Sequence, residues 1–413
     1  MRNARALAMS TVSRCAHDGA FSNIELSNSI DAAQLSEADR NLYASLVYTT
    51  LENLLTIDYF IDKVSNRKMA DTDEQIKNIL RIGTCQIMFM DKIPESAACD
   101  ESVKLAYKSA KPYVNGVLRN MCRMKAELKK GLEKASLSIR YSVSRDICDL
   151  IKEQYPNDYI KILESFSCRL PLCLRVNTLR TNAETVAAKT EGRLQNEIND
   201  CVLVNKNVAE IAKASGNDYF IQGVPSQFAI KLLGAQKGET VIDMCACPGG
   251  KSFSTALEME NTGRIISADI HKNKLKLVEN MAEKLGINII ETMCADGRVE
   301  NETLVESADK VICDVPCSSL GVINSKQEIR YKNKESFERL PEIQYEILKN
   351  GGKYLKKGGS LIYSTCTFNK KENGEVVDRF LRENSDFKLT FERQFMTFKD
   401  KTEGFYVAKL VKK

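Results

Sequence analysis

The stretch ETVIDMCACPGGKS, residues 239–252, decides the fold of the largest part of this chain. Its first six residues form a short apolar run typical of a buried strand, and the loop CACPGGK then leads into a helical pattern. The same order recurs downstream, with further strands expected at 263–270, 287–296, 308–316 and 358–367. Apolar strands that alternate with helices indicate a parallel sheet covered on both faces, in which ligands bind beyond the carboxyl ends of the strands.

Two other textures precede this α/β part, which we expect to span residues 226–413. Residues 1–138 show apolar residues at three- and four-residue spacing, as in SEADRNLYASLVYTTLENLLTIDYFIDKV, and predict an all-α domain. Residues 139–225 mix helical patterns with the short strand-like runs LCLRVNT, CVLVN and DYFIQ, and predict a small α+β domain. The chain is therefore expected to contain three domains.

Composition places the protein among ordinary globular chains. Of its 413 residues, 43% are hydrophobic and 28% are charged, which allows more than one core. The sequence has no signal-peptide core and no run of eighteen apolar residues, so we expect a cytoplasmic protein with no membrane partner. The 14 cysteines are then expected to be reduced, and most of them to be small buried side chains.

The net charge of +5 is unevenly distributed. Residues 104–145 hold eleven Lys or Arg and two acids, a local charge of +9, so the remaining residues together carry −4. A basic segment of this density is typical of a surface that binds nucleic-acid phosphates. A solvated helix face would show the same pattern.

The Gly-rich loop at 245–251 distinguishes between classes of nucleotide. A P-loop requires Gly where Cys245 stands, and the dinucleotide fingerprint GxGxxG is missing. Asp269, at the end of the second strand, is placed to accept hydrogen bonds from ribose, and Asp296, at the end of the third, from an adenine amine. Each Asp alone is more readily explained as a helix cap or turn residue. The ordered set of a turn and two acids at successive strand ends instead favours a nucleoside without phosphates, which points to S-adenosylmethionine.

Two apolar runs end in a cysteine, in DVPCSS (314–319) and YSTCT (363–367). A thiolate that adds to C6 of a pyrimidine makes C5 nucleophilic enough to attack a sulfonium methyl group. One cysteine is then expected to add and another group to assist elimination, while Asp314 hydrogen-bonds ring N3 and the exocyclic amine. Spacing does not tell Cys317 and Cys366 apart.

These motifs resemble the signatures of the RNA cytosine-5 methyltransferases. The resemblance is carried by DMCACPGGKS, DVPCSS, YSTCT followed by ENGE, PLCLRVNTLRTN and IQGVPSQFA. The N-terminal 140 residues resemble the NusB-like helical domain of one branch, through ILRIGTCQIMFMDKIP and YVNGVLRNMCR among others. The resemblance implies a NusB-like RNA-binding domain, a ferredoxin-like middle domain and a Rossmann-like class I methyltransferase domain that acts on a cytosine of small-subunit ribosomal RNA.

The resemblance also implies roles for individual residues. Cys366 would be the nucleophile, Cys317 would assist breakdown of the covalent adduct, and Asp314 and Lys251 would complete the catalytic set. S-adenosylmethionine would be bound by the loop and by strand-end acids, at Cys245, Ala246, Cys247, Pro248, Gly249, Gly250, Lys251, Asp269, Asp296 and Asp314. We expect a monomer without a metal.

Two departures from the family pattern and two rival interpretations accompany this assignment. Residues 143–151 replace a Trp-bearing stretch that is usual in the family, and residues 323–334 lack an arginine-rich start, both at expected RNA-facing or inter-domain surfaces. Cys245, Cys247, Cys313 and Cys317 could instead hold zinc, although their spacing fits poorly. A binding-only adaptor that uses the helical domain is the other alternative.

Overall fold

The computed structural model describes residues 3–17, 22, 25–26 and 35–413, which divide into two compact units. The first unit comprises residues 1–167 together with 323–334, and the second comprises 168–322 together with 335–413. The division is coarser than the three predicted domains, because the small middle sheet and the large sheet fall in one unit. No described helix combines the length and apolar character needed to cross a lipid bilayer.

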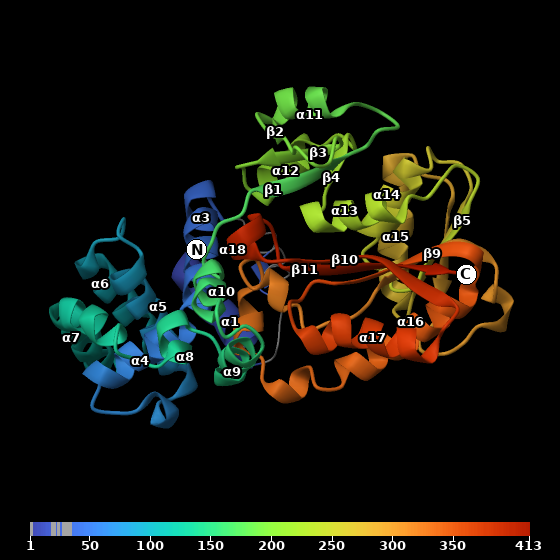
Figure 1. Ribbon diagram of the computed structural model, residues 1–413. Coiled ribbons are helices and arrows are strands. Elements are labelled where there is room, and N and C mark those ends of the chain that lie inside the picture. Colours follow the sequence, from blue (N-terminus) through green and yellow to red (C-terminus); the bar gives the residue numbers. More distant parts are fainter. Residues whose placement is uncertain (1–2, 18–21, 23–24, 27–34) are drawn as a thin grey trace. The chain divides into compact units, whose positions relative to one another are not determined.

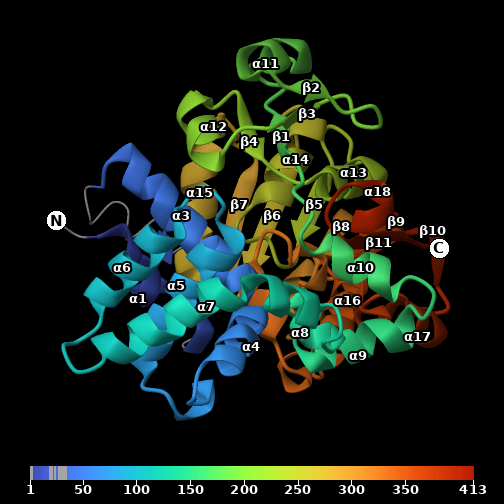
Figure 2. The same cartoon turned by 90° about the vertical axis from the view of Figure 1, so that its left-hand side faces the viewer.

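The first unit is helical, as its sequence predicts. Ser36 caps the helix α3 by accepting a hydrogen bond from the amide of Asp39, and the predicted long helix breaks at Asn53 into α3 and α4. The central helix is α5, whose residues from Asn78 to Met88 are all buried against α3, α4, α6 and α7 (Figure 2). Its helices are α1 (Ala4–His17), α3 (Glu37–Glu52), α4 (Leu54–Val64), η1 (Met69–Asp71), α5 (Glu74–Phe89), α6 (Glu95–Leu105), α7 (Lys111–Leu132), α8 (Leu137–Tyr141), α9 (Arg145–Gln154), α10 (Tyr159–Ser165) and η4 (Gln327–Tyr331).

Residues 323–334 belong to the core of this first unit, although they lie between the two cysteine motifs in the sequence. The Arg330 guanidinium is 1% exposed and donates to the carbonyl groups of Tyr141 and Phe166, at 3.1 and 2.7 Å. The Tyr331 hydroxyl contacts the carbonyl of Leu51. The segment expected to face RNA or another domain therefore buries its arginine inside the helical unit.

The second unit begins with a small antiparallel sheet of strand order β2-β3-β1-β4. One face of this sheet packs on helices α11 and α12, and the other on α13 (Figure 2). Of the four strands of this sheet, only the two-residue β2 was not predicted. The elements are β1 (Leu172–Val176), α11 (Ala183–Thr190), β2 (Arg193–Leu194), β3 (Cys201–Val204), α12 (Val208–Ala214), β4 (Tyr219–Ile221) and α13 (Val224–Leu233).

The large sheet has seven strands in the order β10-β11-β9-β8-β5-β6-β7. The five predicted strands are parallel to one another, and β10 and β11, which were not predicted, pair antiparallel, so the sheet is mixed. Alternate residues of each central strand face opposite helical layers, with α13, α14 and α15 on one face and α16 and α17 on the other (Figure 1). The predicted cover on both faces is confirmed.

The strands of this sheet are β5 (Thr240–Asp243), β6 (Arg264–Asp269), β7 (Ile290–Cys294), β8 (Ala308–Asp314), β9 (Leu355–Thr365), β10 (Phe387–Phe395) and β11 (Phe405–Lys412). The α-helices are α14 (Gly250–Glu258), α15 (Lys272–Leu285), α16 (Leu340–Tyr354), α17 (Gly374–Glu383) and α18 (Thr397–Asp400). Short 3₁₀ turns are η2 (Glu302–Leu304), η3 (Leu320–Val322), η5 (Lys334–Ser336) and η6 (Lys370–Glu372).

Candidate active site

The Gly-rich loop connects β5 to α14 at the carboxyl edge of the sheet. Ala246 donates its amide to the carbonyl of Ala268 at 2.8 Å, and Cys247 donates its amide to Asp269 Oδ2 at 3.2 Å. Gly249 has φ +109°, and a Cβ there would lie 2.3 Å from the Phe253 ring. The loop is thus held against the end of β6, and only glycine fits at 249.

A cavity of about 210 Å³ opens beside this loop. Lys251 donates from Nζ to Asp314 Oδ2 at 2.7 Å and to Ser226 Oγ at 3.3 Å within it. Burial disfavours the charge of Lys251, but the neighbouring carboxylates, Asp314 first, raise its pKa above the usual value. The cavity therefore contains a fixed positive charge beside an ionic carboxylate.

Asp243, at the end of β5, also lines this cavity. The side chain is 1% exposed, its Oδ2 accepts from the Ser252 hydroxyl at 2.7 Å, and its Oδ1 has no hydrogen-bond partner among the described residues. Burial, which penalises the charged form, raises the pKa of Asp243 to about 7. A buried acceptor without a donor is costly, so this oxygen fits a ligand that supplies one.

The other two strand-end acids differ in their placement. Asp269 is 9% exposed and accepts the amides of Cys247 and His271, which fixes the loop against β6. Asp296 does not line the cavity. Arg298 donates from Nε to the two carboxylate oxygens of Asp296, at 3.0 and 3.1 Å. Hydrogen bonds from Arg298 lower the pKa of Asp296. The structure thus joins Asp269 to the loop and leaves Asp296 outside the cavity.

The two cysteine motifs meet because their strands are neighbours. Strands β8 and β9 are parallel, and Asp314 pairs with Ser364, so the chain leaves the sheet twice at adjacent points. The Sγ atoms of Cys317 and Cys366 lie 3.2 Å apart. The Ser364 hydroxyl donates to Asp314 Oδ1 at 2.7 Å, which connects the cysteine pair to the Lys251 ion pair.

The surroundings of the two sulfurs distinguish them. A hydrogen bond with Cys366, followed by burial, raises the pKa of Cys317 well above its usual value. Cys317 is therefore held as a thiol that can donate to Cys366. The charge of Lys251 also acts on Cys366, because the two groups interact electrostatically.

Ser319 and Glu372 are site residues that sequence reasoning did not identify. Ser319 has φ +63°, a conformation that is uncommon for a residue with a side chain, and its Oγ lies 3.5 Å from the Cys366 sulfur. Glu372 is fully buried and bridges both cysteine loops, since it accepts from the amide of Ser318 at 2.8 Å and from Asn369 at 2.9 Å. Both residues lie in motifs of the sequence, DVPCSS and ENGE, but a motif does not show which atoms are in contact.

Glu372 has no cation within ion-pair distance among the described residues; its third donor is the Gln344 amide, at 3.0 Å. Three hydrogen bonds replace the water that a carboxylate loses on burial. Cys245, Cys247, Cys313 and Cys317 all lie in the described part of the chain, which holds no cluster of three or more side chains arranged to bind a metal.

Comparisons with known proteins identify the family. Residues 230–411 match the family described as 16S rRNA methyltransferase RsmB/F, residues 2–123 match the NusB family, and residues 147–207 match the RsmF/B-like ferredoxin-like domain. The probable ribosomal RNA small subunit methyltransferase B of Bacillus subtilis (strain 168) is 32% identical over 409 residues, which are 94% of this chain and 91% of that protein. The enzyme named ribosomal RNA small subunit methyltransferase B from Shigella boydii is 28% identical and aligns over 100% and 99% of the two chains.

Solved structures share the fold. The crystal structure of PH0851 has a TM-score of 0.81 at 21% identity and covers 100% of this chain and 99% of its own. NSun6 from Pyrococcus horikoshii, solved with SFG, has a TM-score of 0.60 at 19% identity, and the match covers 65% of this chain and 98% of that one. The predicted NusB-like, ferredoxin-like and methyltransferase parts are confirmed, and the chain belongs to the ribosomal RNA small subunit methyltransferase B family.

Proposed function

We propose that this chain methylates C5 of a cytosine in small-subunit ribosomal RNA through a transient bond between Cys366 and ring carbon C6. The observation that supports it most is the pair of sulfurs 3.2 Å apart, next to the ion pair of Lys251 and Asp314. Methylation of small-subunit ribosomal RNA follows from membership of the family. The cytosine, its C5 atom and the adduct are our proposal.

Cys366 adds as the thiolate, and the addition places electron density on C5. Lys251 stabilises the thiolate before addition, because its charge reaches Cys366. Asp314 accepts a hydrogen bond from the exocyclic amine beside ring N3, while Lys251 and Ser364 hold both its oxygens in place. Each carboxylate oxygen can accept more than one donor, so the ring shares Asp314 without displacing Lys251.

Cys317 assists the end of the reaction. Once the methyl group is on C5, the C5 proton leaves to a base and the bond between C6 and the Cys366 sulfur breaks, so that Cys366 departs as a thiolate. Cys317 is held as a thiol and donates a hydrogen bond to that sulfur, which stabilises the departing charge. The raised pKa of Cys317 and the charge of Lys251 near Cys366 support the choice of Cys366 as the nucleophile.

The proposed methyl donor is S-adenosylmethionine, which supplies an electrophilic methyl group. The residues that would hold it are the loop from Cys245 to Lys251, with Asp269 fixing that loop and the open Oδ1 of Asp243 offering an acceptor. Asp296 would contribute only after Arg298 releases it. A cytoplasmic location and a monomeric state complete the proposal.

The test is methyl transfer from labelled S-adenosylmethionine to small-subunit ribosomal RNA, with bisulfite sequencing to locate the product. We expect a single modified cytosine with the wild-type chain and none with Cys366→Ala, which should still bind the methyl donor. Turnover by Cys366→Ala would contradict the nucleophilic role, and RNA binding without methylation would favour the adaptor.

A further inference from the structure

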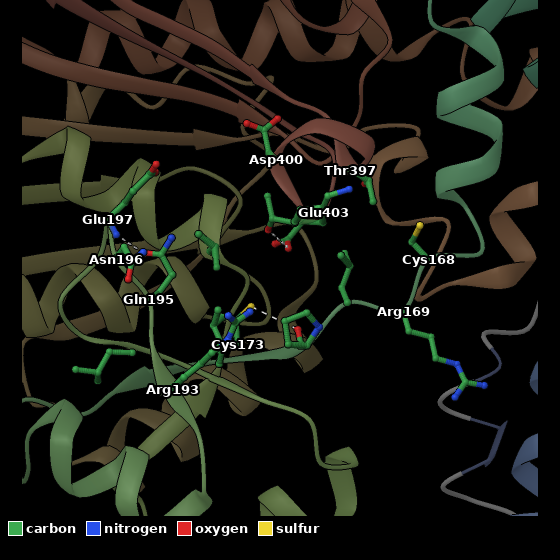
Figure 3. Close-up of a pocket in the computed structure, with 17 residues that line it drawn as sticks. Cys168, Arg169, Cys173, Arg193, Gln195, Asn196, Glu197, Thr397, Asp400 and Glu403 are labelled. Atoms are coloured by element: carbon green, nitrogen blue, oxygen red, sulfur yellow. Dashed lines mark hydrogen bonds between the residues drawn. The ribbon is translucent and has the colours of Figure 1, made fainter.

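A second cavity, of about 440 Å³, lies in the same unit as the active site (Figure 3). Its walls come from residues 168–171 before β1, from the connection between β2 and β3, and from the turn between α18 and β11. Apolar side chains such as Leu203 and Val224 form part of the lining, and uncharged polar and charged side chains form the rest. Two of its acids, Glu197 and Asp400, form ion pairs with Arg393. A volume of this size, with mixed lining, suits one nucleotide.

Three cations line this cavity. Arg169, Arg193 and Lys401 are exposed, and none of them forms an ion pair with an acid of the described residues. In Figure 3, Arg169 extends away from the other labelled side chains. Cations without acidic partners at the mouth of a cavity attract the phosphates of a nucleic acid.

One acid in the lining, Glu403, has no cation within ion-pair distance in the described part of the chain. Glu403 packs so closely on Gly223 that a Cβ there would lie 1.4 Å from its Oε1, which accounts for the glycine in IQGVPSQ. Its Oε2 accepts from the Thr402 hydroxyl at 3.0 Å. Burial raises the pKa of Glu403. A partly desolvated carboxylate of this kind is stabilised by a ligand that brings N–H donors.

The two cavities are close neighbours along the chain. Gly223 lines the cavity beside the Gly-rich loop, and the next residue, Val224, lines the second cavity. The charge of Lys251 acts on Glu403, and the Phe405 ring, two residues further on, lies 5.3 Å from Lys251 Nζ. An RNA strand whose cytosine reaches Cys366, beside Lys251, would therefore bring an adjoining nucleotide near the second cavity.

We propose that this cavity binds a nucleotide adjacent to the methylated cytosine and selects a base that carries an exocyclic amine, a selection that rests on the proposed function. Glu403 accepts from the amine of cytosine, adenine or guanine, and the three cations contact the backbone phosphates. Uracil has no exocyclic amine, and its one donor on that edge, N3–H, is flanked by two carbonyl oxygens that repel the carboxylate. Splayed single-stranded RNA exposes the base edges that such a site reads.

The experiment uses the full chain and a transcript of the methylated ribosomal RNA region with the nucleotides on both sides of the target cytosine randomised. Methylation rates for each sequence are read by bisulfite sequencing. We expect the wild type to disfavour uracil about tenfold at one flanking position, as for loss of one hydrogen bond to a charged group. Glu403→Gln, which keeps the shape of the side chain, should reduce this preference to less than about twofold.

Cation variants test the phosphate contacts separately. The double variant Arg193→Gln, Lys401→Gln should raise KM several-fold for all sequences and lower the salt dependence of binding. Lys357→Gln is the matched control, because Lys357 is an exposed cation near the amino end of β9, away from the strand ends that form the site. Thermal unfolding of each variant checks that the fold is retained.

A filter-binding arm uses the same RNA library with S-adenosylhomocysteine and needs no turnover. Enrichment of amine-bearing bases by the wild type, and its loss in Glu403→Gln, would support the cavity even if no methylation were seen, an outcome that would overturn only the proposed function. Methylation or binding with no flanking preference, or with a preference unchanged in Glu403→Gln, would overturn the cavity proposal alone.

Discussion

At the scale of single residues, the site depends on buried polar groups whose partners lie far away in the sequence. Glu372 joins the loops of Cys317 and Cys366 through three hydrogen bonds, and Asp243 keeps one oxygen without a partner among the described residues. Such groups are costly unless satisfied, which makes each substitution informative. Both acids lie in recognisable sequence motifs, but the groups that they contact could be identified only from the folded structure.

Replacing Glu372 with Gln should separate the two cysteine loops. The Gln side chain would point an N–H donor at groups that are themselves donors to Glu372. We therefore expect a decrease of about 1.5 to 3 kcal/mol in the free energy of unfolding and a fall in kcat. Glu375→Gln is the control within the same ENGE motif, because Glu375 is exposed. Denaturant unfolding and methylation rates measure both effects, and equal behaviour of the two variants would contradict the bridging role.

Asp243 predicts a pH dependence of stability. Its folded-state pKa is about 7 against an ordinary value of 3.8, so between these pH values the folded chain binds a proton that the unfolded chain has released. Stability contributed by this group is therefore present below about pH 4 and is lost as pH rises toward 7. Asp243→Asn should flatten this fall, as measured by unfolding from pH 5 to 8; an unchanged slope would show that Asp243 is not the group that titrates.

At the scale of elements, strands with a strong apolar pattern were predictable and mixed ones were not. The strands β5, β6 and β8 are largely buried and lead into functional motifs, whereas β10, FKLTFERQF, is a charged edge strand that pairs only with β11. Strand β11 carries no motif. The approach of Cys317 to Cys366 also follows from pairing of β8 with β9, which sequence order alone does not specify.

Gly321, in η3, and Gly404, just before β11, show how closely these two segments pack. The Gly404 amide donates to the Gly321 carbonyl at 2.8 Å, and a Cβ on Gly321 would lie 1.9 Å from the Gly404 oxygen. Gly321→Ala should therefore destabilise the fold and slow methylation. Gly116→Ala, in the middle of α7 with open space around it, should instead raise stability by about 0.5 to 1 kcal/mol. Thermal unfolding compares the two, and similar shifts in Tm would contradict this packing.

The basic segment predicted from the sequence corresponds largely to α7. Lys129, Lys130 and Lys134 are exposed, while Lys125 lies 3.0 Å from Glu95. Replacing the three exposed lysines with Gln should weaken RNA binding and reduce the slope of log affinity against log salt by about 0.7 to 0.9 for each phosphate that is no longer neutralised. Lys125→Gln should have a smaller effect. An unaltered salt slope in the triple variant would show that these lysines are solvated and do not contact RNA phosphates.

At the scale of the whole molecule, the division of the chain into parts could be predicted only approximately. The predicted helical, mixed and α/β textures were correct, but nothing in the sequence of residues 323–334 shows that they belong to the helical unit. Arg330 there satisfies two buried carbonyl groups, a role that its sequence context does not reveal. Long-range contacts of this kind depend on the folded chain, whereas apolar periodicity is local.

Arg330→Ala should strongly destabilise the first unit, because it leaves the carbonyls of Tyr141 and Phe166 buried without these donors. We expect the free energy of unfolding to fall by about 3 kcal/mol or more. Lys326→Ala, at an exposed position of the same segment, is the control. Denaturant unfolding followed by circular dichroism measures both. Equal stability of the two variants would show that Arg330 does not anchor this segment.

The most direct test of the reaction is to identify the residue that bonds to the RNA. The chain is incubated with S-adenosylmethionine and small-subunit ribosomal RNA that contains 5-fluorocytosine, whose C5 fluorine cannot leave as a proton does, so the adduct persists. Tandem mass spectrometry of the digested complex should find the pyrimidine on the Cys366 sulfur, with Cys317 unmodified. A pyrimidine on Cys317 with Cys366 free, or methylated RNA with no adduct on either sulfur, would contradict the account.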